Sequence, residues 1–168
     1  ITTYNKKTAK LQVNVSKAPK SISISPKAAT LCIGETLEPN VSLNTGALGS
    51  YALSSSDEQI AVITDDGHGV RAVAGGTVQI TAASYNGKKA AMTITVLALP
   101  TEIALTPATA QAGAGEQLQL RAVMPDGQGS YLRYESSDPN VATVNDSGRV
   151  QTRQAGTVRI RAYTQNNL

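Results

Sequence analysis

Apolar and polar residues alternate with a period of two along much of the chain. The alternation is clearest at Ser21–Ser25, Val78–Ala82 and Ala91–Val96, where every second residue is apolar. A period of two places one set of side chains on each face of a strand, which is typical of strands with one buried face. No stretch of twelve residues sustains the 3.6-residue period of a helix, so the pattern predicts an all-β fold.

Gly, Asn, Asp and Pro separate the predicted strands at short intervals, as turns require. Asn86-Gly87 lies between two alternating stretches and predicts a two-residue hairpin turn in which both residues have positive φ. Gly76 and Gly156 come just before the most regular strand of their region, where a tight turn is expected. Many short strands joined by regular turns favour a sandwich of two sheets.

The chain contains an internal repeat. Four motifs recur in the same order: Ile22–Pro26 with Ile103–Pro107, Gly34–Leu37 with Gly115–Leu118, Ser55–Asp57 with Ser136–Asp138, and Gly76–Ala82 with Gly156–Ala162. The first three pairs are 81 residues apart and the last pair 80, so one residue is lost between the third motif and the fourth. A repeat of this length indicates tandem modules.

The N-terminal stretch Tyr4–Val15 repeats the pattern of Tyr85–Val96 at the same interval of 81 residues. Residues 1–17 are therefore predicted to be the terminal strand or strands of a preceding module. Residues 18–98 form a complete module, and residues 99–168 form a second module that lacks its last strand. A proline ends each linker, at Pro19 and Pro100, and is expected to stiffen the connection.

The order of these motifs resembles the bacterial immunoglobulin-like domain, group 2, related forms of which occur in tandem in intimin- and invasin-type surface proteins. The resemblance covers nearly the whole chain and runs through SISISP, GET, SSSD, AGGTVQITA and SYNGKKA. It implies tandem immunoglobulin-like β-sandwich modules of about seven strands, on an extracellular or bacterial cell-surface protein. The chain lacks the Cys-Trp-Cys pattern of antibody domains. Some relatives bind calcium, but no set of ligands carries over to this sequence residue by residue.

The composition fits this fold and limits its chemistry. The chain has no Phe or Trp, so its core must be built from Val, Ile, Leu and Ala. Cys32 is the only cysteine and is expected to be a small buried residue without a disulfide. No apolar run approaches the ~20 residues of a membrane span, and no signal peptide is visible in a chain that does not begin with Met.

The positive charges are unevenly distributed. The net charge is +3, and residues 1–34 contain six lysines and no acid, whereas the last third is positive only through arginine. Lysine at exposed strand edges discourages aggregation, which is one interpretation of the lysines. The other is contact with an anionic ligand such as a wall polymer, a glycan or a host protein. The residues predicted for such contact are Arg153, Arg159, Arg161, Lys6, Lys7 and Lys10.

No catalytic, cofactor or metal site is predicted. His68, the only imidazole, lies in a turn that the second module forms without histidine, so a hydrolase using His68 with Ser54 or Ser55 is disfavoured. Asp65, Asp66 and Asp146 suggest calcium, but turn formation is favoured because the spacing of calcium loops is absent. Nucleic acid is set aside because the positive charges lack stacking aromatics.

Three functions remain open on the sequence. In the first, the modules are a non-catalytic stalk or adhesive array of a surface protein and contact other modules of that protein. In the second, they bind an anionic polymer, a glycan or a host protein. In the third, residues 4–16 of one chain complete residues 99–168 of another by strand addition. A proteolytic or disordered end, or an arbitrary boundary of the fragment, is the simpler explanation of the unpaired strand.

Overall fold

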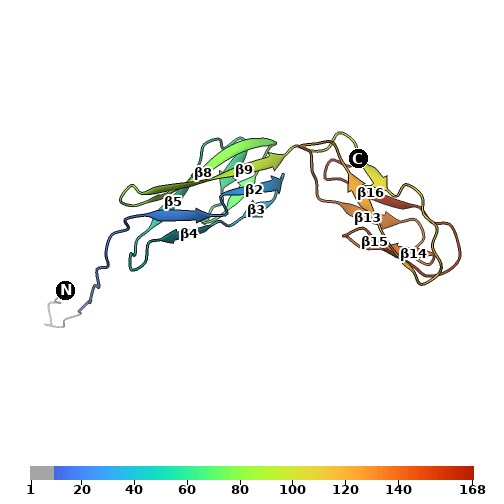
Figure 1. The fold of residues 1–168 in the computed structure, drawn as a ribbon, viewed down its shortest axis with the longest axis horizontal. Coiled ribbons are helices and arrows are strands. Elements are labelled where there is room, and N and C mark those ends of the chain that lie inside the picture. The colour runs from blue at the N-terminus through green and yellow to red at the C-terminus, as the bar shows by residue number, and fades with distance from the viewer. Residues whose placement is uncertain (1–9) are drawn as a thin grey trace, which may run out of the picture.

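The computed structural model describes residues 10–168, and the fold is all-β, as predicted. The first module comprises nine strands that run from blue to green in Figure 1. They are β1 (Ile22–Ser25), β2 (Ala28–Cys32), β3 (Thr36–Leu37), β4 (Asn40–Leu43), β5 (Tyr51–Ser55), β6 (Ala61–Ile63), β7 (Val70–Ala72), β8 (Gly76–Ser84) and β9 (Lys89–Leu97). The largest sheet has the order β2-β9-β8-β5, and smaller sheets pair β3-β7-β6 and β1-β4. Strand β2 runs parallel to β9, and the other pairs are antiparallel.

The core of the first module is aliphatic, as the composition predicts. Val78 and Ile80 on β8, and Ile94 and Val96 on β9, point inward and are at most 3% exposed. The two buried positions on each strand are two residues apart, because alternate side chains of a strand share one face. Burying a side chain of this size stabilises the fold by about 1.5–3 kcal/mol.

The second module repeats most of this arrangement with seven strands. They are β10 (Ala104–Thr106), β11 (Gln117–Gln119), β12 (Arg121–Val123), β13 (Arg133–Ser136), β14 (Ala142–Val144), β15 (Arg149–Thr152) and β16 (Ile160–Tyr163). The sheets are β10-β12, β11-β15-β14 and β13-β16, which are the counterparts of β1-β4, β3-β7-β6 and β5-β8. The apolar core is smaller, with Leu120, Ala142 and Val150 as its fully buried members.

The two modules differ around strand β9. In the first module β9 lies between β2 and β8, and residues 76–79 of β8 pair only with β9. Within residues 10–168 the second module has no strand in the place of β9. Residues 109–113 and 156–159, the counterparts of β2 and of the start of β8, consequently form no strand. A strand needs a hydrogen-bonding neighbour, so segments whose counterparts pair only with β9 are not strands, whereas residues 160–163 still pair with β13.

The hairpin between β8 and β9 exists, but the predicted turn geometry is wrong. The Ser84 N–H donates to the Lys88 carbonyl at 2.8 Å, and the Gly87 N–H donates to the Ser84 carbonyl at 2.9 Å. Gly87 has a φ of +82°, whereas Asn86 is not among the residues with positive φ. The connection is therefore a longer turn with one left-handed glycine. Asn86 instead donates from Nδ2 to the Pro19 carbonyl at 2.7 Å, which ties the hairpin to the linker.

Gly76 and Gly156 both lie where neighbouring side chains approach closely. A Cβ at Gly76 would lie 2.7 Å from Ile60, and one at Gly156 would lie 2.7 Å from Val141. Gly76 also has a φ of +151°, which other residues rarely adopt. A larger residue would have to displace Ile60 or Val141 at these positions.

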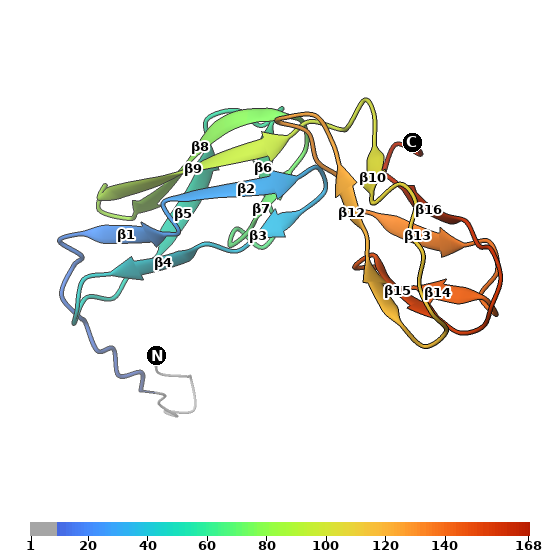
Figure 2. The same ribbon diagram turned by 45° about the vertical axis from the view of Figure 1, so that its right-hand side comes forward.

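The N-terminal arm, which we define as residues 10–16, has no secondary structure. Its apolar side chains face solvent: Leu11 is 87% exposed, Val13 69% and Val15 91%. Figure 2 shows the arm leaving the first module at the end opposite the second module. The assignment of residues 1–17 to a preceding module stays a prediction, and residues 1–9 lie outside the described part.

Candidate functional site

The junction between the modules is formed by backbone hydrogen bonds. After β9 the chain reaches Ala98, whose N–H donates to the Gly127 carbonyl at 3.1 Å and whose carbonyl accepts from the Gly129 N–H at 2.9 Å. These bonds make a parallel bridge between Ala98 and Gln128. The Gln128 side chain continues the contact, because its Oε1 accepts from the Thr101 N–H at 2.7 Å. The linker is therefore held by the module that follows it.

Side chains close the junction from both modules. Gly129 is buried, and a Cβ there would lie 2.5 Å from Leu97 and 3.3 Å from the Cys32 sulfur. The Gln165 side chain donates to the Ile33 carbonyl at 3.0 Å, which links residues 132 positions apart. Close packing and a hydrogen bond across the junction restrict the angle between the modules.

Two groups at the junction, the Cys32 thiol and the Tyr131 phenol, have raised pKa values. Desolvation by burial raises the pKa of the half-buried Cys32 thiol, and the Glu35 carboxylate raises it further. The pKa of Tyr131, in the second module, is raised by desolvation and then by the same carboxylate. A negative charge disfavours both the thiolate and the phenolate. Cys32 is thus a partly exposed junction residue, rather than the buried core residue that the sequence predicts.

The N-terminal linker has the same geometry as the linker between the modules. Lys17 makes a parallel bridge with Ala47, as Ala98 does with Gln128, and each pair is 81 residues from its counterpart. The Leu48 N–H approaches the Lys17 carbonyl at 3.4 Å, in the manner of Gly129 and Ala98. The chain therefore enters the first module along the path by which it enters the second.

An open groove of about 1080 Å³ runs along the second module between residues 107–114 and residues 154–161. These two walls are the counterparts of the strands that flank β9 in the first module. Val158 and Ile160 line the groove and are half-buried, whereas their counterparts in β8 are fully buried. The groove is therefore the place that β9 occupies in the first module.

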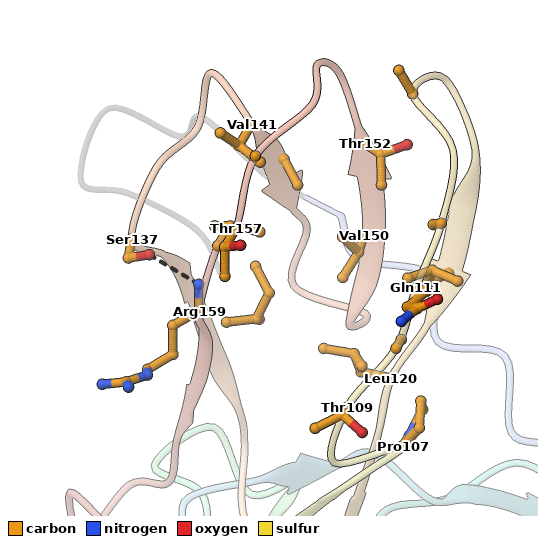
Figure 3. Close-up of a pocket in the computed structure, with 18 of the residues that line it drawn as sticks. Pro107, Thr109, Gln111, Leu120, Ser137, Val141, Val150, Thr152, Thr157 and Arg159 are labelled. Atoms are coloured by element: carbon orange, nitrogen blue, oxygen red, sulfur yellow. Dashed lines mark hydrogen bonds between the residues drawn. The ribbon is translucent and has the colours of Figure 1, made fainter.

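Figure 3 shows the groove from its open side. Val150 and Leu120 lie between Gln111 on one side and Thr157 on the other, so the interior is apolar and the rims are polar. At one rim the Arg159 N–H donates to Ser137 Oγ at 3.0 Å, while the Arg159 side chain extends away from the groove.

The predicted cationic residues lie on separate segments of the chain. Arg161 is exposed on β16, Arg159 is exposed just before that strand, and Arg153 is exposed on the loop after β15. Lys10 is exposed on the N-terminal arm, and Lys6 and Lys7 lie outside the described residues.

The repeated Ser-Ser-Asp motif forms a turn, as predicted. Ser55 Oγ accepts from the Asp57 N–H at 3.3 Å, and Asp57 Oδ1 accepts from the N–H two residues later at 2.9 Å. Ser136 and Asp138 repeat both bonds at the same distances. The serines and the aspartate therefore satisfy backbone donors that the turn leaves unpaired.

The turn that contains His68 is held by Asp66. Asp66 Oδ1 accepts from the Thr64 hydroxyl and from the His68 N–H, and these bonds lower the pKa of the Asp66 carboxyl, the hydroxyl having the larger effect. The His68 ring lies edge-on to Tyr51 at 6.2 Å. Within the described residues, the Ser54 and Ser55 hydroxyls donate to the carbonyls of Thr81 and Asp57, and no hydrogen bond joins the His68 ring to a serine.

Groups of three or more His, Cys, Asp or Glu placed to hold a metal do not occur among residues 10–168. In the same part of the chain, no helix has the length and apolar character needed to cross a membrane.

The fold is that of tandem immunoglobulin-like domains. Residues 118–165 match the family described as "Intimin, immunoglobulin-like domain", which covers less than half of the chain. The comparison with curated proteins found no match.

Three solved structures illustrate the structural similarity. The S-layer protein rSbsC(31-844) is 15% identical, with a TM-score of 0.44 over 95% of this chain and 24% of its own. SbsC domains 4 and 5 are 15% identical, with a TM-score of 0.38 over 89% of this chain and 95% of theirs. Human Protocadherin-24 EC1-2 is 12% identical, with a TM-score of 0.36 over 93% of this chain and 89% of its own. The chain spans about a quarter of the S-layer protein, and similarities at this level carry no functional argument.

Sequence reasoning identified the Ser-Ser-Asp turns and the core of the first module, but not the contacts at the junction. Gln165 and Ile33 are far apart in sequence and carry no motif, so only the packing of the two modules brings them together. The signal that could have identified the junction is glycine at Gly129, where the first module has Leu48 at the corresponding position.

Proposed function

We propose that this chain is a non-catalytic segment of a bacterial cell-surface or secreted protein, in which tandem immunoglobulin-like modules serve as a stalk or spacer. We assign the modules to the bacterial immunoglobulin-like group 2, with one module at residues 18–98 and a second at residues 99–168. The order of the repeated motifs supports this assignment. The intimin-type match over residues 118–165 is consistent with a surface protein.

The main support for the proposal is the set of contacts between the two modules at the junction. A spacer must keep its modules at a fixed angle, and a linker without contacts would let them rotate independently. Here Gly129 packs against Leu97, and the Gln165 side chain reaches the Ile33 carbonyl. In Figure 1 the two modules lie end to end along the longest axis of the molecule. Length with restricted bending is the property that a stalk requires.

Small-angle X-ray scattering tests this proposal. A stiff pair of modules should give an elongated particle, whose pair-distance distribution has a long tail and matches one orientation of the modules. A compact particle, or a profile that only a wide range of inter-module angles can fit, would rule out the spacer.

Binding of an anionic ligand is a second candidate, supported by the arginines of the second module. Arg159 and Arg161 are both exposed, and neither takes part in a salt bridge within the described residues, whereas Arg133 pairs with Glu135. Wall polymers and anionic glycans are the ligand classes that such charges suit. Retention on an anionic column should disappear at moderate salt and in Arg159→Ser/Arg161→Ser. Retention that persists in salt, or in this variant, would exclude these residues as the site.

A further inference from the structure

One outer surface of the second module carries three arginines. It consists of the outward side chains of the β13-β16 pair and of the residue just before β16, namely Arg133, Glu135, Arg159, Arg161 and Tyr163. We call this surface the arginine face. Side chains two residues apart share one face of a strand, so these five point away from the apolar core. Figure 3 shows the Arg159 side chain extending away from the open groove as well. The arginine face is therefore a different surface from the groove.

The backbone holds Arg159 in line with the β13-β16 pair. The Arg159 N–H donates to Ser137 Oγ at 3.0 Å, and the Arg159 carbonyl accepts from the Ser137 N–H at 3.0 Å. Gln79 makes the same two bonds with Ser56 in the first module, at 3.1 Å and 3.0 Å. Arg159 thus occupies a backbone position that both modules share, and only its side chain differs.

The charges are specific to the second module. The counterparts of the arginine face in the first module are all uncharged: Ala52, Ser54, Gln79, Thr81 and Ala83. The two sets lie on equivalent strand pairs, β5-β8 and β13-β16. Folding of this pair therefore does not require arginine, and the arginines point to a binding function of the second module.

Two of the three arginines have no carboxylate bound to them. Arg133 pairs with Glu135 and lies over the Tyr163 ring, with its guanidinium carbon 4.8 Å from the ring centroid. Arg159 and Arg161 take part in no salt bridge within residues 10–168. Three arginines and one glutamate give the arginine face a net charge of +2.

We propose that the arginine face binds an extended anionic polysaccharide through carboxylate or phosphate groups spaced along its chain. This proposal rests on the second candidate function above, and it adds the surface, a third arginine and the class of ligand. Arg159 and Arg161 lie about 6.8 Å apart along the chain, and Arg133 lies on the next strand, about 4.8 Å across. A single anion gains little from one exposed arginine, whereas a polymer contacts several at once. The planar guanidinium suits both carboxylate and phosphate groups.

The composition of the face favours a polysaccharide over a protein or a nucleic acid. A protein partner needs apolar anchors at the centre of its interface, and every residue of the arginine face except Tyr163 is charged. Single-stranded nucleic acid needs exposed aromatic rings on which its bases can stack. Tyr163 is half-buried, and Arg133 lies over its ring. Recognition by charge and hydrogen bonding remains, and a polysaccharide with acidic groups and hydroxyls supplies both.

Biolayer interferometry on immobilised polymers tests the proposal with the whole chain. Polygalacturonate presents carboxylates, phosphorylated dextran presents phosphates, and unmodified dextran is the uncharged blank. The chain should bind at least one of the two anionic polymers and should not bind dextran. The polymer that binds more tightly identifies the acidic group.

Two pairs of substitutions locate the site. Arg159→Ser/Arg161→Ser should weaken binding on the order of 5–20-fold at low salt. The matched control is Arg121→Ser/Arg149→Ser, which removes the same charge from β12 and β15, in other sheets. The control variant should bind like the wild type, because its arginines lie outside the arginine face.

Glu135 gives a test of opposite sign. It pairs with Arg133 and lies opposite Arg161, so it competes with an acidic ligand for both. Glu135→Gln should therefore tighten binding on the order of 2–5-fold. Glu102→Gln removes the same charge from an exposed position outside the arginine face and should leave binding unchanged.

The outcomes separate this proposal from the function on which it rests. Binding to neither anionic polymer would overturn both. Equal weakening by the two arginine pairs, or equal effects of the two glutamate substitutions, would overturn the arginine face and leave anion binding as an effect of net charge. Binding to polyglutamate or to single-stranded DNA that is as tight as binding to the polysaccharides would overturn the class of ligand.

Discussion

Replacing one isoleucine by alanine at equivalent positions of the two modules should have unequal effects on stability. Ile80 of β8 is 0% exposed and belongs to the core of the first module. Its counterpart, Ile160 of β16, is half-buried and lines the open groove. The chemical change is the same, and β5 and β13 are equivalent neighbours of the two positions. The comparison therefore isolates the effect of β9, which covers Ile80 but has no counterpart over Ile160 in the described residues.

The expected losses follow from burial. Ile80→Ala removes a fully buried side chain and leaves a closed cavity, which should lower the free energy of unfolding of the first module by about 2–5 kcal/mol. Ile160→Ala removes a side chain that water already reaches in part, and the groove stays open. The second module should therefore lose only about 1–2 kcal/mol.

Urea unfolding followed by NMR signals of each module gives the two free energies. Equal losses, or a larger loss at Ile160, would refute the reasoning, because the groove would then be as closed as the first core.

Three further predictions concern the junction and one turn. Gly129→Ala places a Cβ 2.5 Å from Leu97 and should widen the range of inter-module angles in scattering, whereas Gly113→Ala, whose Cβ would have no neighbour closer than 3.5 Å, should leave it unchanged. Cys32 should react with a thiol reagent more slowly than free cysteine at the same pH, because burial and then the Glu35 carboxylate raise its pKa, and a rate equal to that of free cysteine would contradict this environment of the thiol. The lowered pKa of Asp66 adds stability above the pKa of the unfolded chain, and this contribution is lost as the pH falls through the folded pKa. Asp66→Asn should therefore flatten the acid side of a plot of urea midpoint against pH, and an unchanged slope would count against the turn bonds.

Much of the fold could be predicted from the sequence because it depends on local patterns. The period of two placed Val78, Ile80 and Ala82 on one face, and the structure buries all three. The repeated Ser-Ser-Asp motif predicted its own turn, since the hydroxyl and the carboxylate each accept from a backbone N–H two residues away. Signals of this kind need no knowledge of distant residues.

Other features could not be predicted because they depend on contacts between distant segments. The period of two extends equally through Gly76–Ala82 and Gly156–Ala162, yet only the first is strand throughout. The difference comes from β9, which pairs with the first segment and has no counterpart in the described second module. The turn at Asn86-Gly87 was predicted too tight, because Asn86 bonds to the linker instead of adopting a positive φ.

Hydrogen exchange measured residue by residue tests the central claim most directly. That claim is that the first module is a closed sandwich and the second is the same sandwich with one strand site open. In the chain of 168 residues, amides of Gly76–Ile80 should be strongly protected and those of Gly156–Ile160 weakly protected, and a copy of Lys89–Leu97 appended after Leu168 should raise the protection of the second set. Equal protection of the two segments without any added strand would contradict the account.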